Sequence, residues 1–514
     1  MPHGMTRAEF LALGLTAAGA GLLPGRAARA AADQITILQT EPPRSMDPAD
    51  HTASYTAAVL SPMYEGLTCF NEKLQVVPCL ATEWSSDPAG LEWMFKLRPG
   101  VTFHDGTALD AAAVAASFAR HLDAKRGLAS SGRIRSAVAA VTARDPMTVA
   151  FMLKAPYPAW LRLLATGNAA VVSPKADAAG TLGRQPVGTG PYAFVEWVSD
   201  DHVLQRRHDG YWGGKPAVGA LKWTWTTEAA VMNMAVRTGD ADVVNPLPPA
   251  FAGPLKTQRG VGLLEGDGSA VFWVALNTQL KPLDDARVRQ ALNWATDRAA
   301  LVRTLFYGYG TPADSPLAPA DLFHKPSSPY GYDPARAKAL LAEAGHPGGI
   351  AISLAVQEPE AALAEALQGM WAAAGVQLDV QRMESGVWTS AAFGTPEQKA
   401  AAKLHAVLAS WSTGFIDPDL QLRPLYATAS WSPKGPNLGF YSNGDLDALL
   451  DHAGSTLDAE ERRRLYAQAQ DTIETDAPHV LLYVSRDLAA VRSDVQGVWF
   501  VPGGQVMVAG ARRA

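Results

Sequence analysis

Two pairs of acidic residues have the types and spacing that general acid–base catalysis uses: Asp284 with Asp285, and Asp417 with Asp419. The first pair stands at the head of an amphipathic segment, where carboxylates stabilise a helix N-terminus by about 0.3–1 kcal/mol. The second pair flanks Pro418 in a predicted turn. Neither pair requires catalysis to explain it.

The sequence motifs of enzymes, nucleotide sites and metal sites are absent. GTGP at 188–191 is the most obvious glycine-rich loop, but it runs into a predicted strand, which favours a simple turn. His202 and His208 are spaced for neither one helical face nor a compact zinc site. There is no H-E-x-x-H, C-x-x-C or G-x-S-x-G motif. We therefore expect no enzymatic activity, no cofactor and no metal.

Aromatic residues near polar loops remain as candidates for binding. Trp273, Trp388, Trp411 and Phe415 all lie after residue 270. A tryptophan buries a large face while its indole N–H reaches a polar partner, which favours clefts. Core packing is the simpler explanation for any one of them alone.

The composition is that of a mildly acidic globular chain. It has 514 residues, 48% of them hydrophobic, and a formal net charge of -6. This length suffices for two or more packed cores. Basic residues are spread along the chain rather than clustered, so we expect no nucleic-acid partner.

The first 32 residues have the pattern of a secretory signal peptide. A short polar leader precedes an apolar run that is too short to span a bilayer, and small residues with A-x-A sites follow. TRAEFL is similar to the twin-arginine export motif but has Ala8 in place of the second arginine, so both export routes stay open. No cysteine in the leader can carry a lipid, so we expect a free periplasmic protein.

Cys69 and Cys79 are the only cysteines of the chain. They flank a predicted hairpin with its turn near 71–73, and they would not lie directly opposite each other in it. An oxidising compartment permits a disulfide between them, and the sequence leaves this pairing open.

The predicted elements alternate as in an α/β protein. A strand at 351–357, a helix at 360–375 and a strand at 376–383 predict a crossover in a mixed or parallel sheet. Apolar strands near 269–278 and 480–486 are expected to cross between two lobes.

Local sequence signals predict several further elements. They are a hairpin turn at Asp145-Pro146, two strands around Pro99-Gly100, a helix over 108–124 capped by Asp105 or Thr107, and one long helical region over 284–308. A further helix is expected to have Asp333 as its N-cap, Pro334 as its first residue and Gly345 as its C-terminal stop.

A series of motifs resembles the extracytoplasmic solute-binding protein family 5, which serves ABC importers of dipeptides, oligopeptides, nickel and glutathione. The resemblance covers nearly the whole mature chain, in conserved order and spacing of motifs. The motifs are YEGLT at 64–68, LRPGVTFHDGTALDAAAV at 97–114, PVGTGPYAF at 186–194, YWGGKP at 211–216, ALNT at 275–278, ARVRQALNWATDR at 286–298, YDPARAKALLAEAG at 332–345, SWSTGFIDPD, FYSNGDLDALL and ERRRLYAQAQ.

The resemblance implies a two-lobed periplasmic binding protein of type II with an extra subdomain, mixed sheets and hinge strands. Such a protein closes on its ligand, and a membrane permease recognises the closed shape. The implied divisions are a signal peptide at 1–32, lobe one at 33–68, 181–269 and 485–514, an inserted subdomain at 69–180, and lobe two at 270–484.

The resemblance also implies where the ligand binds. Peptide binders of the family carry an aspartate three residues after the tryptophan of the SWSTGF segment, and here that position is Gly414. A buried ammonium without a carboxylate would cost several kcal/mol, so ordinary dipeptides are unfavoured. Lys399 and Lys403 are candidates for an anionic ligand. The implied ligand-binding residues are Thr52, Ala53, Ser54, Tyr55, Trp273, Asn277, Trp388, Trp411, Gly414, Phe415 and Asp417.

The function implied is capture of a small peptide-like, glutathione-like, opine or chelate ligand by a monomer, and its delivery to ABC transporter permease subunits. Two alternatives stay open at this point. One is a secreted two-lobed hydrolase, and the other is a sensor or chaperone with the same closing motion.

Overall fold

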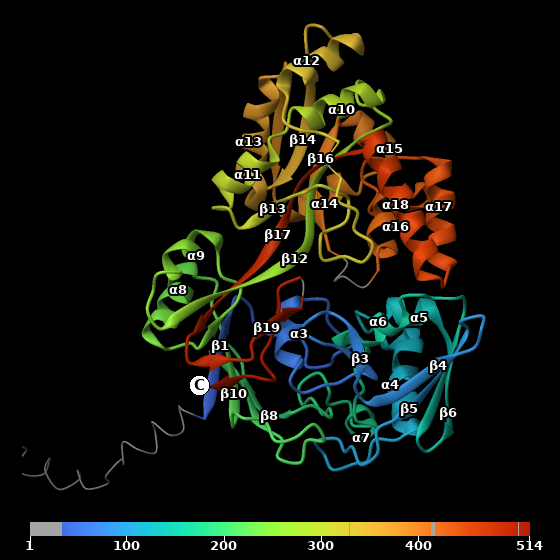
Figure 1. Ribbon diagram of the computed structural model, residues 1–514, viewed down its shortest axis with the longest axis vertical. Helices are drawn as coiled ribbons and strands as arrows, with labels where there is room; N and C mark the ends of the chain where they lie inside the picture. Colours follow the sequence, from blue (N-terminus) through green and yellow to red (C-terminus); the bar gives the residue numbers. More distant parts are fainter. Residues whose placement is uncertain (1–32, 328, 413–416, 502) are drawn as a thin grey trace, which may run out of the picture.

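The computed structural model describes residues 33–327, 329–412, 417–501 and 503–514. Two halves, one above the other in Figure 1, are joined by the long strands β12 (Val261–Leu276) and β17 (His479–Arg492). The predicted signal peptide lies outside the described residues. Among the helices described, none has the length and apolar character that crossing a membrane requires.

One mixed sheet of 11 strands runs through both halves. At its upper end β14 pairs in parallel with both β15 and β16, whereas β12 pairs antiparallel with β16 and β17. The predicted α/β class with mixed sheets is therefore confirmed. In order the strands are β15 (Val376–Met383), β14 (Ile350–Gln357), β16 (Ala406–Trp411), β12, β17, β11 (Val243–Val244), β1 (Gln34–Gln39), β10 (Ala220–Trp225), β9 (His202–Arg207) and β8 (Tyr192–Val198), with β13 (Gly310–Pro312) on β17.

The β12–β17 ladder continues from Val261 opposite Arg492 to Ala275 opposite His479. Its register shifts between Asp267 and Val271, which is the kind of irregularity that bends a strand. Gly268 stands inside this shift, where a Cβ atom would lie 2.2 Å from the backbone oxygen of Ser485. The two strands therefore approach so closely there that only glycine fits.

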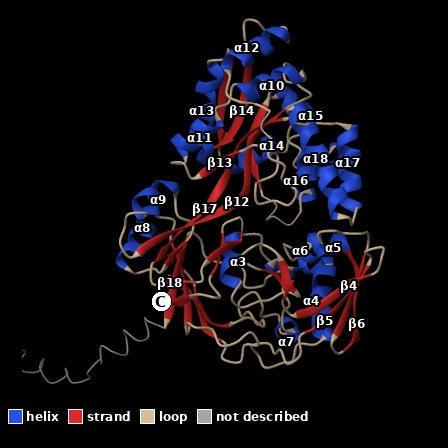
Figure 2. Ribbon diagram, in the orientation of Figure 1, coloured by secondary structure: helices blue, strands red, loops and turns tan. Residues whose placement is uncertain are grey.

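The lower half has a second, separate core on the right of Figure 2, where strands lie against short helices. Four antiparallel strands in the order β4-β5-β7-β6 pack aromatic rings against helix α4 (Ala111–Leu122). Phe151 contacts Phe95, Phe118 and Trp160 through edge-on rings at 4.8–5.5 Å, a geometry that aromatic pairs prefer. The strands are β4 (Ala81–Ser86), β5 (Glu92–Leu97), β6 (Val138–Asp145) and β7 (Thr148–Leu153).

The remaining elements of the lower half are short. A hairpin of β2 (Thr68–Phe70) and β3 (Val76–Pro78) follows helix α3 (Ser54–Leu60), and two-stranded pairs close the C-terminal segment. The other elements are α5 (Gly132–Ala137), α6 (Trp160–Leu164), α7 (Pro174–Ala178), α8 (Ala229–Thr238), α9 (Pro249–Leu255), β18 (Val495–Gln496), β19 (Trp499–Val501), β20 (Gln505–Met507) and β21 (Arg512–Arg513).

The upper half buries apolar helix faces against β12, β14, β16 and β17. Helix α13 (Ala361–Ala372) connects the parallel strands β14 and β15, which confirms the predicted crossover. The other helices are α10 (Ala286–Trp294), α11 (Arg298–Leu305), α12 (Pro334–Glu343), α14 (Ser385–Ala392), α15 (Pro396–Ala401), α16 (Asp419–Tyr426), α17 (Gly444–Ser455) and α18 (Ala459–Asp476).

Three local predictions are wrong. Asp110, not Asp105 or Thr107, caps α4 by accepting the N–H of Ala113 at 2.8 Å, because Asp105 instead holds the preceding turn at Thr107. The long helical region is two helices, since a new N-cap at Asp297 starts α11. The second strand after Pro99-Gly100 is reduced to one bridge between Thr102 and Ala108.

Candidate ligand-binding site

A cavity of about 610 Å³ is lined mostly by residues of the lower half. This volume is within the range of about 300–1,000 Å³ that small-molecule sites occupy. Its walls come from the loop before α3, the β2–β3 hairpin, residues 165–168, the Tyr211–Trp212 pair, the C-terminal segment, and Ser412 at the end of β16. Segments far apart in the sequence therefore form one solute-sized space, and Ser412 connects it to β12 through a hydrogen bond with Ser269.

The loop before α3 forms one wall of the cavity, and hydrogen bonds from Asn168 fix its backbone. Asn168 donates its side-chain N–H groups to the carbonyl oxygens of Pro48 at 2.9 Å and His51 at 3.3 Å. Three of the residues predicted to face the ligand, Thr52, Ala53 and Ser54, line the cavity. The fourth, Tyr55, lies beside them under the guanidinium of Arg44, 5.9 Å from the ring centroid.

Glu65 is the acidic group of the cavity, and its oxygens are already engaged. They accept hydrogen bonds from Thr189 Oγ1 at 2.8 Å, the hydroxyl of Tyr211 at 2.7 Å and the indole N–H of Trp212 at 2.9 Å. Burial raises the pKa of Glu65, against the effect of these donors. Sequence reasoning did not place these residues in the site, although they lie in or near the YEGL, GTGP and YWGGKP motifs that it singled out.

Arg133 is the one arginine or lysine among the described residues that line the cavity. It stands on the short helix α5, and its side chain is exposed. A guanidinium is always charged and presents a planar fork of donors that suits a carboxylate. The charge available to a solute in this cavity is therefore positive.

Two predicted site residues, Trp273 and Asn277, are instead part of the interior. Trp273 is 2% exposed and its ring stacks on His479, with centroids 5.2 Å apart. Asn277 donates to the carbonyl oxygen of Leu404 and accepts the backbone N–H of Gln279. Neither residue lines the 610 Å³ cavity.

The residues predicted around the SWSTGF segment have separate surroundings. Trp388 packs partly buried against the upper core, and the indole N–H of Trp411 donates to the carbonyl oxygen of Leu420 at 2.9 Å. Asp417 is 3% exposed and forms an ion pair with Arg462 at 2.7 Å. Gly414 and Phe415 lie outside the described residues.

Lys399, predicted for an anionic ligand, is engaged inside the upper half. Its ammonium donates to the carbonyl oxygen of Leu438 at 2.7 Å and lies 4.8 Å from the ring centroid of Phe440. The side chain is 2% exposed. The capped helix α15 (Pro396–Ala401) turns Lys399 inward.

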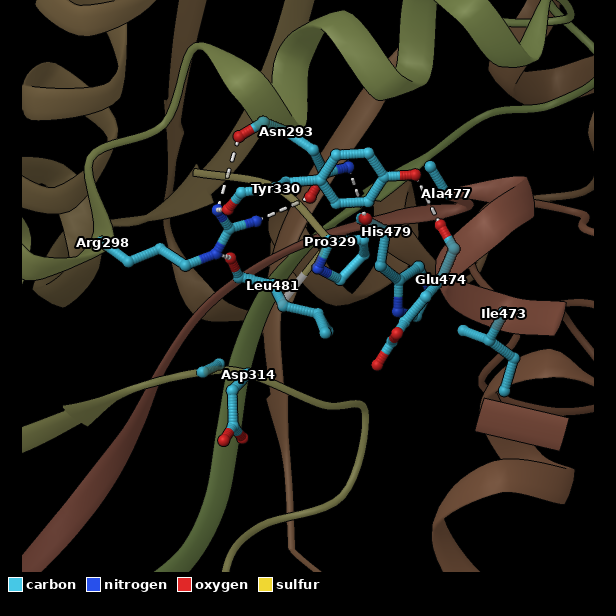
Figure 3. Close-up of a pocket in the computed structure, with 11 residues that line it drawn as sticks. Asn293, Arg298, Asp314, Pro329, Tyr330, Ile473, Glu474, Ala477, His479 and Leu481 are labelled. Atoms are coloured by element: carbon cyan, nitrogen blue, oxygen red, sulfur yellow. Dashed lines mark hydrogen bonds between the residues drawn. The ribbon is translucent and has the colours of Figure 1, made fainter. Parts of the chain in front are cut away.

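A second cavity in the upper half holds only about 20 Å³, which is room for about one water molecule. Figure 3 shows Arg298 pointing across it, donating to Asn293 Oδ1 and to the carbonyl oxygen of Leu481, both at 2.7 Å. Burial lowers the pKa of Arg298 to about 10. This is an internal polar network, too small for a solute. Within the described ranges, no three His, Cys, Asp or Glu side chains gather to hold a metal ion.

Two halves that share a pair of long strands, together with a solute-sized cavity, define the class of two-lobed solute-binding proteins. Residues 75–433 match the family of bacterial extracellular solute-binding proteins, family 5 (middle region), and the chain belongs to this family. The resemblance seen in the sequence is thereby confirmed.

Several known proteins are similar to this chain over nearly its whole length. The glutathione-binding protein GsiB of Pectobacterium atrosepticum is 33% identical over 464 residues, covering 89% of this chain and 90% of the relative. HbpA2 from Haemophilus parasuis superposes with a TM-score of 0.84 at 27% identity, covering 94% of this chain and 100% of that one. A dipeptide-binding protein from Pseudoalteromonas sp. SM9913, in complex with Met-Leu, has a TM-score of 0.76 at 25% identity, covering 94% and 100%. Two of these relatives are thus solute-binding proteins, one for glutathione and one for a dipeptide.

Proposed function

We propose that this protein captures a small, anionic, peptide-like solute of the glutathione kind in the 610 Å³ cavity and delivers it to the permease of an ABC importer. The observation that carries the proposal is the cavity itself, which is solute-sized and reaches Ser412, a residue hydrogen-bonded to Ser269 of β12. The glutathione-binding relative supports the ligand class.

The charges at the cavity favour a solute with carboxylates. Arg133 is exposed to the cavity, whereas the oxygens of Glu65 are occupied by three donors of the protein. An Arg–carboxylate contact is a charge-assisted hydrogen bond, and such bonds contribute about 1.5–3 kcal/mol. A peptide-like compound with more carboxylates than ammonium groups suits this arrangement better than a plain dipeptide.

Transport requires that the two halves close over the solute. We assign lobe one to 33–269 and 485–514, with an inserted subdomain at 69–180, and lobe two to 270–484. Support comes from the shift in the β12–β17 ladder between Asp267 and Val271, which marks where the strands bend. Support for the subdomain comes from its separate sheet and core. The closed monomer would then dock on the permease in the periplasm.

The test is calorimetric titration of the full mature protein with reduced glutathione, Met-Leu and a nickel–histidine chelate. We expect glutathione to bind, and Arg133→Ala to weaken it about tenfold or more. Arg135→Ala is the matched control, because Arg135 is on the same helix but does not line the cavity. Binding of Met-Leu with no response to glutathione would overturn the ligand class. Turnover of a bound compound would overturn the transport role.

A further inference from the structure

The two cysteines lie on the same face of the β2–β3 hairpin. Cys69 pairs with Val77 in the ladder, and the N–H of Cys79 donates to the carbonyl oxygen of Leu67 at 3.3 Å. Residues opposite each other in an antiparallel pair share a face, as do residues two apart on one strand. Cys69 and Cys79 are therefore diagonal neighbours on one face of the hairpin.

Both cysteines line the 610 Å³ cavity, but they are not equivalent. Cys69 is partly exposed, whereas Cys79 is 5% exposed, and both are free thiols in this structure. The Cys79 thiol lies 3.8 Å from Glu65 Oε1, and Arg98 donates to the carbonyl oxygen of Cys79 at 3.0 Å. The accessible thiol of Cys69 is therefore a neighbour of the buried thiol of Cys79.

The pKa values of the two thiols are shifted in opposite directions, in agreement with their different exposure. The neighbouring thiol of Cys79 lowers the pKa of Cys69, and the nearby charge of Arg98 acts in the same direction. The neighbouring thiol of Cys69, together with burial and the carboxylate of Glu65, raises the pKa of Cys79. Since the thiolate is the nucleophile, Cys69 is the thiol prepared to attack and Cys79 stays protonated.

We propose that Cys69 and Cys79 form a redox-active dithiol that exchanges with disulfide-bearing solutes in the cavity. Small disulfides of thiol peptides are the chemical class that fits. This inference rests on the cavity of the proposed function being open to solutes, but it does not require import.

The exchange proceeds in two balanced steps. The Cys69 thiolate attacks one sulfur of R–S–S–R, the disulfide bond breaks, and R–S⁻ leaves and takes up a proton as a mixed disulfide forms. Cys79 then loses its proton and attacks Cys69 Sγ, which releases the second R–S⁻, protonated in turn to R–SH. Two protein thiols are oxidised to one disulfide, while one solute disulfide is reduced to two thiols.

The test treats reduced full-length protein with bis(2-hydroxyethyl) disulfide, stops the reaction with acid, and measures the intact mass. We expect the wild-type protein to lose two hydrogens and keep no adduct. A tryptic digest adds the site, because cleavage after Lys73 separates the two cysteines unless a disulfide joins their peptides. A wild-type protein that stays reduced, or that carries one adduct on each cysteine, overturns the proposal.

Two variants test the order of the steps. Cys79→Ser should stop at one adduct on Cys69, whereas Cys69→Ser should react at least tenfold more slowly. In urea both variants should react alike, which shows that the difference comes from the fold. Equal rates in the folded variants would overturn the assigned roles. The probe requires no solute recognition, so a failed glutathione titration and a failed exchange are separate results.

Discussion

One nitrogen of Arg462, Nη2, donates to both carboxylate oxygens of Asp417, at 2.9 and 2.7 Å. The side chains are 6% and 2% exposed, so water reaches neither charge. Asp417 Oδ1 also accepts the N–H of Asp419 at 3.0 Å. The ion pair links the start of α16 to α18. The carboxylate of Asp417 therefore makes its contacts inside the upper half.

Asp417→Asn is expected to destabilise the protein by about 3–5 kcal/mol, because it leaves the charge of Arg462 buried without a counter-charge. Urea unfolding of the full chain measures the change. Glu83→Gln is the matched control, since Glu83 pairs with Lys96 at 2.9 Å on the surface with both side chains 67% exposed. We expect it to cost no more than about 1 kcal/mol. Equal costs would contradict the interpretation.

Gly268→Ala is expected to cost about 1–3 kcal/mol, because the new methyl group would meet the backbone oxygen of Ser485 at 2.2 Å and push β12 from β17. Faster amide hydrogen exchange in both strands should accompany the loss of stability. In the control, Gly369→Ala, nothing lies within 4 Å of the added atom in α13. That variant should be stabilised by up to about 1 kcal/mol. Unchanged exchange in Gly268→Ala would refute close strand contact there.

The burial of Lys399 predicts that the free energy of unfolding rises with pH. Burial lowers its pKa from the ordinary 10.5 to about 7. Between these values the unfolded chain binds a proton that the folded protein has released, so the unfolding free energy rises by at most about 1.4 kcal/mol per pH unit. Lys399→Met should lose this rise between pH 7 and 10, while Lys338→Met, on the exposed face of α12, should follow the wild type. Parallel curves for all three proteins would disprove it.

The burial of Asp487 predicts the opposite effect at lower pH, where the free energy of unfolding falls as the pH rises. Burial raises its pKa from 3.8 to about 6, although it accepts the N–H groups of Gly503 and Gly504 at 3.0 and 2.9 Å. The folded protein therefore holds a proton that the unfolded chain has lost, and stability falls as the pH rises through this window. Asp487→Asn should remove that fall, whereas Asp379→Asn on the exposed side of β15 should keep it. Thermal unfolding between pH 4 and 6.5 compares them.

Sequence reasoning succeeded where short-range chemistry decides the structure. Asp333 caps α12, Pro334 begins it, and Gly345 follows it with a positive φ, because capping and the left-handed conformation are properties of a few adjacent residues. The hairpin turn at Asp145-Pro146 and the strand–helix–strand unit around α13 follow from the same local signals.

The site could be predicted only in part, because long-range contacts assemble it. Glu65 meets Tyr211 across 146 positions of the chain in the cavity, whereas Asp417, predicted for the site, is paired with Arg462 across 45 positions inside the upper half. No periodicity or spacing specifies such pairs. Burial of Trp273 and Lys399 likewise depends on what packs over them, which one sequence does not specify. Thr52, Ala53 and Ser54 were placed through the family resemblance rather than from their own chemistry.

The ladder of β12 and β17 has a consequence for which changes of length the chain tolerates. Side chains of a strand alternate between two faces, so adding or removing a single residue there would exchange every inward group for an outward one. Loops of the same protein have no such constraint. Insertions and deletions should therefore be excluded from 261–267 and 486–492, where the register is regular, while loops elsewhere vary in length.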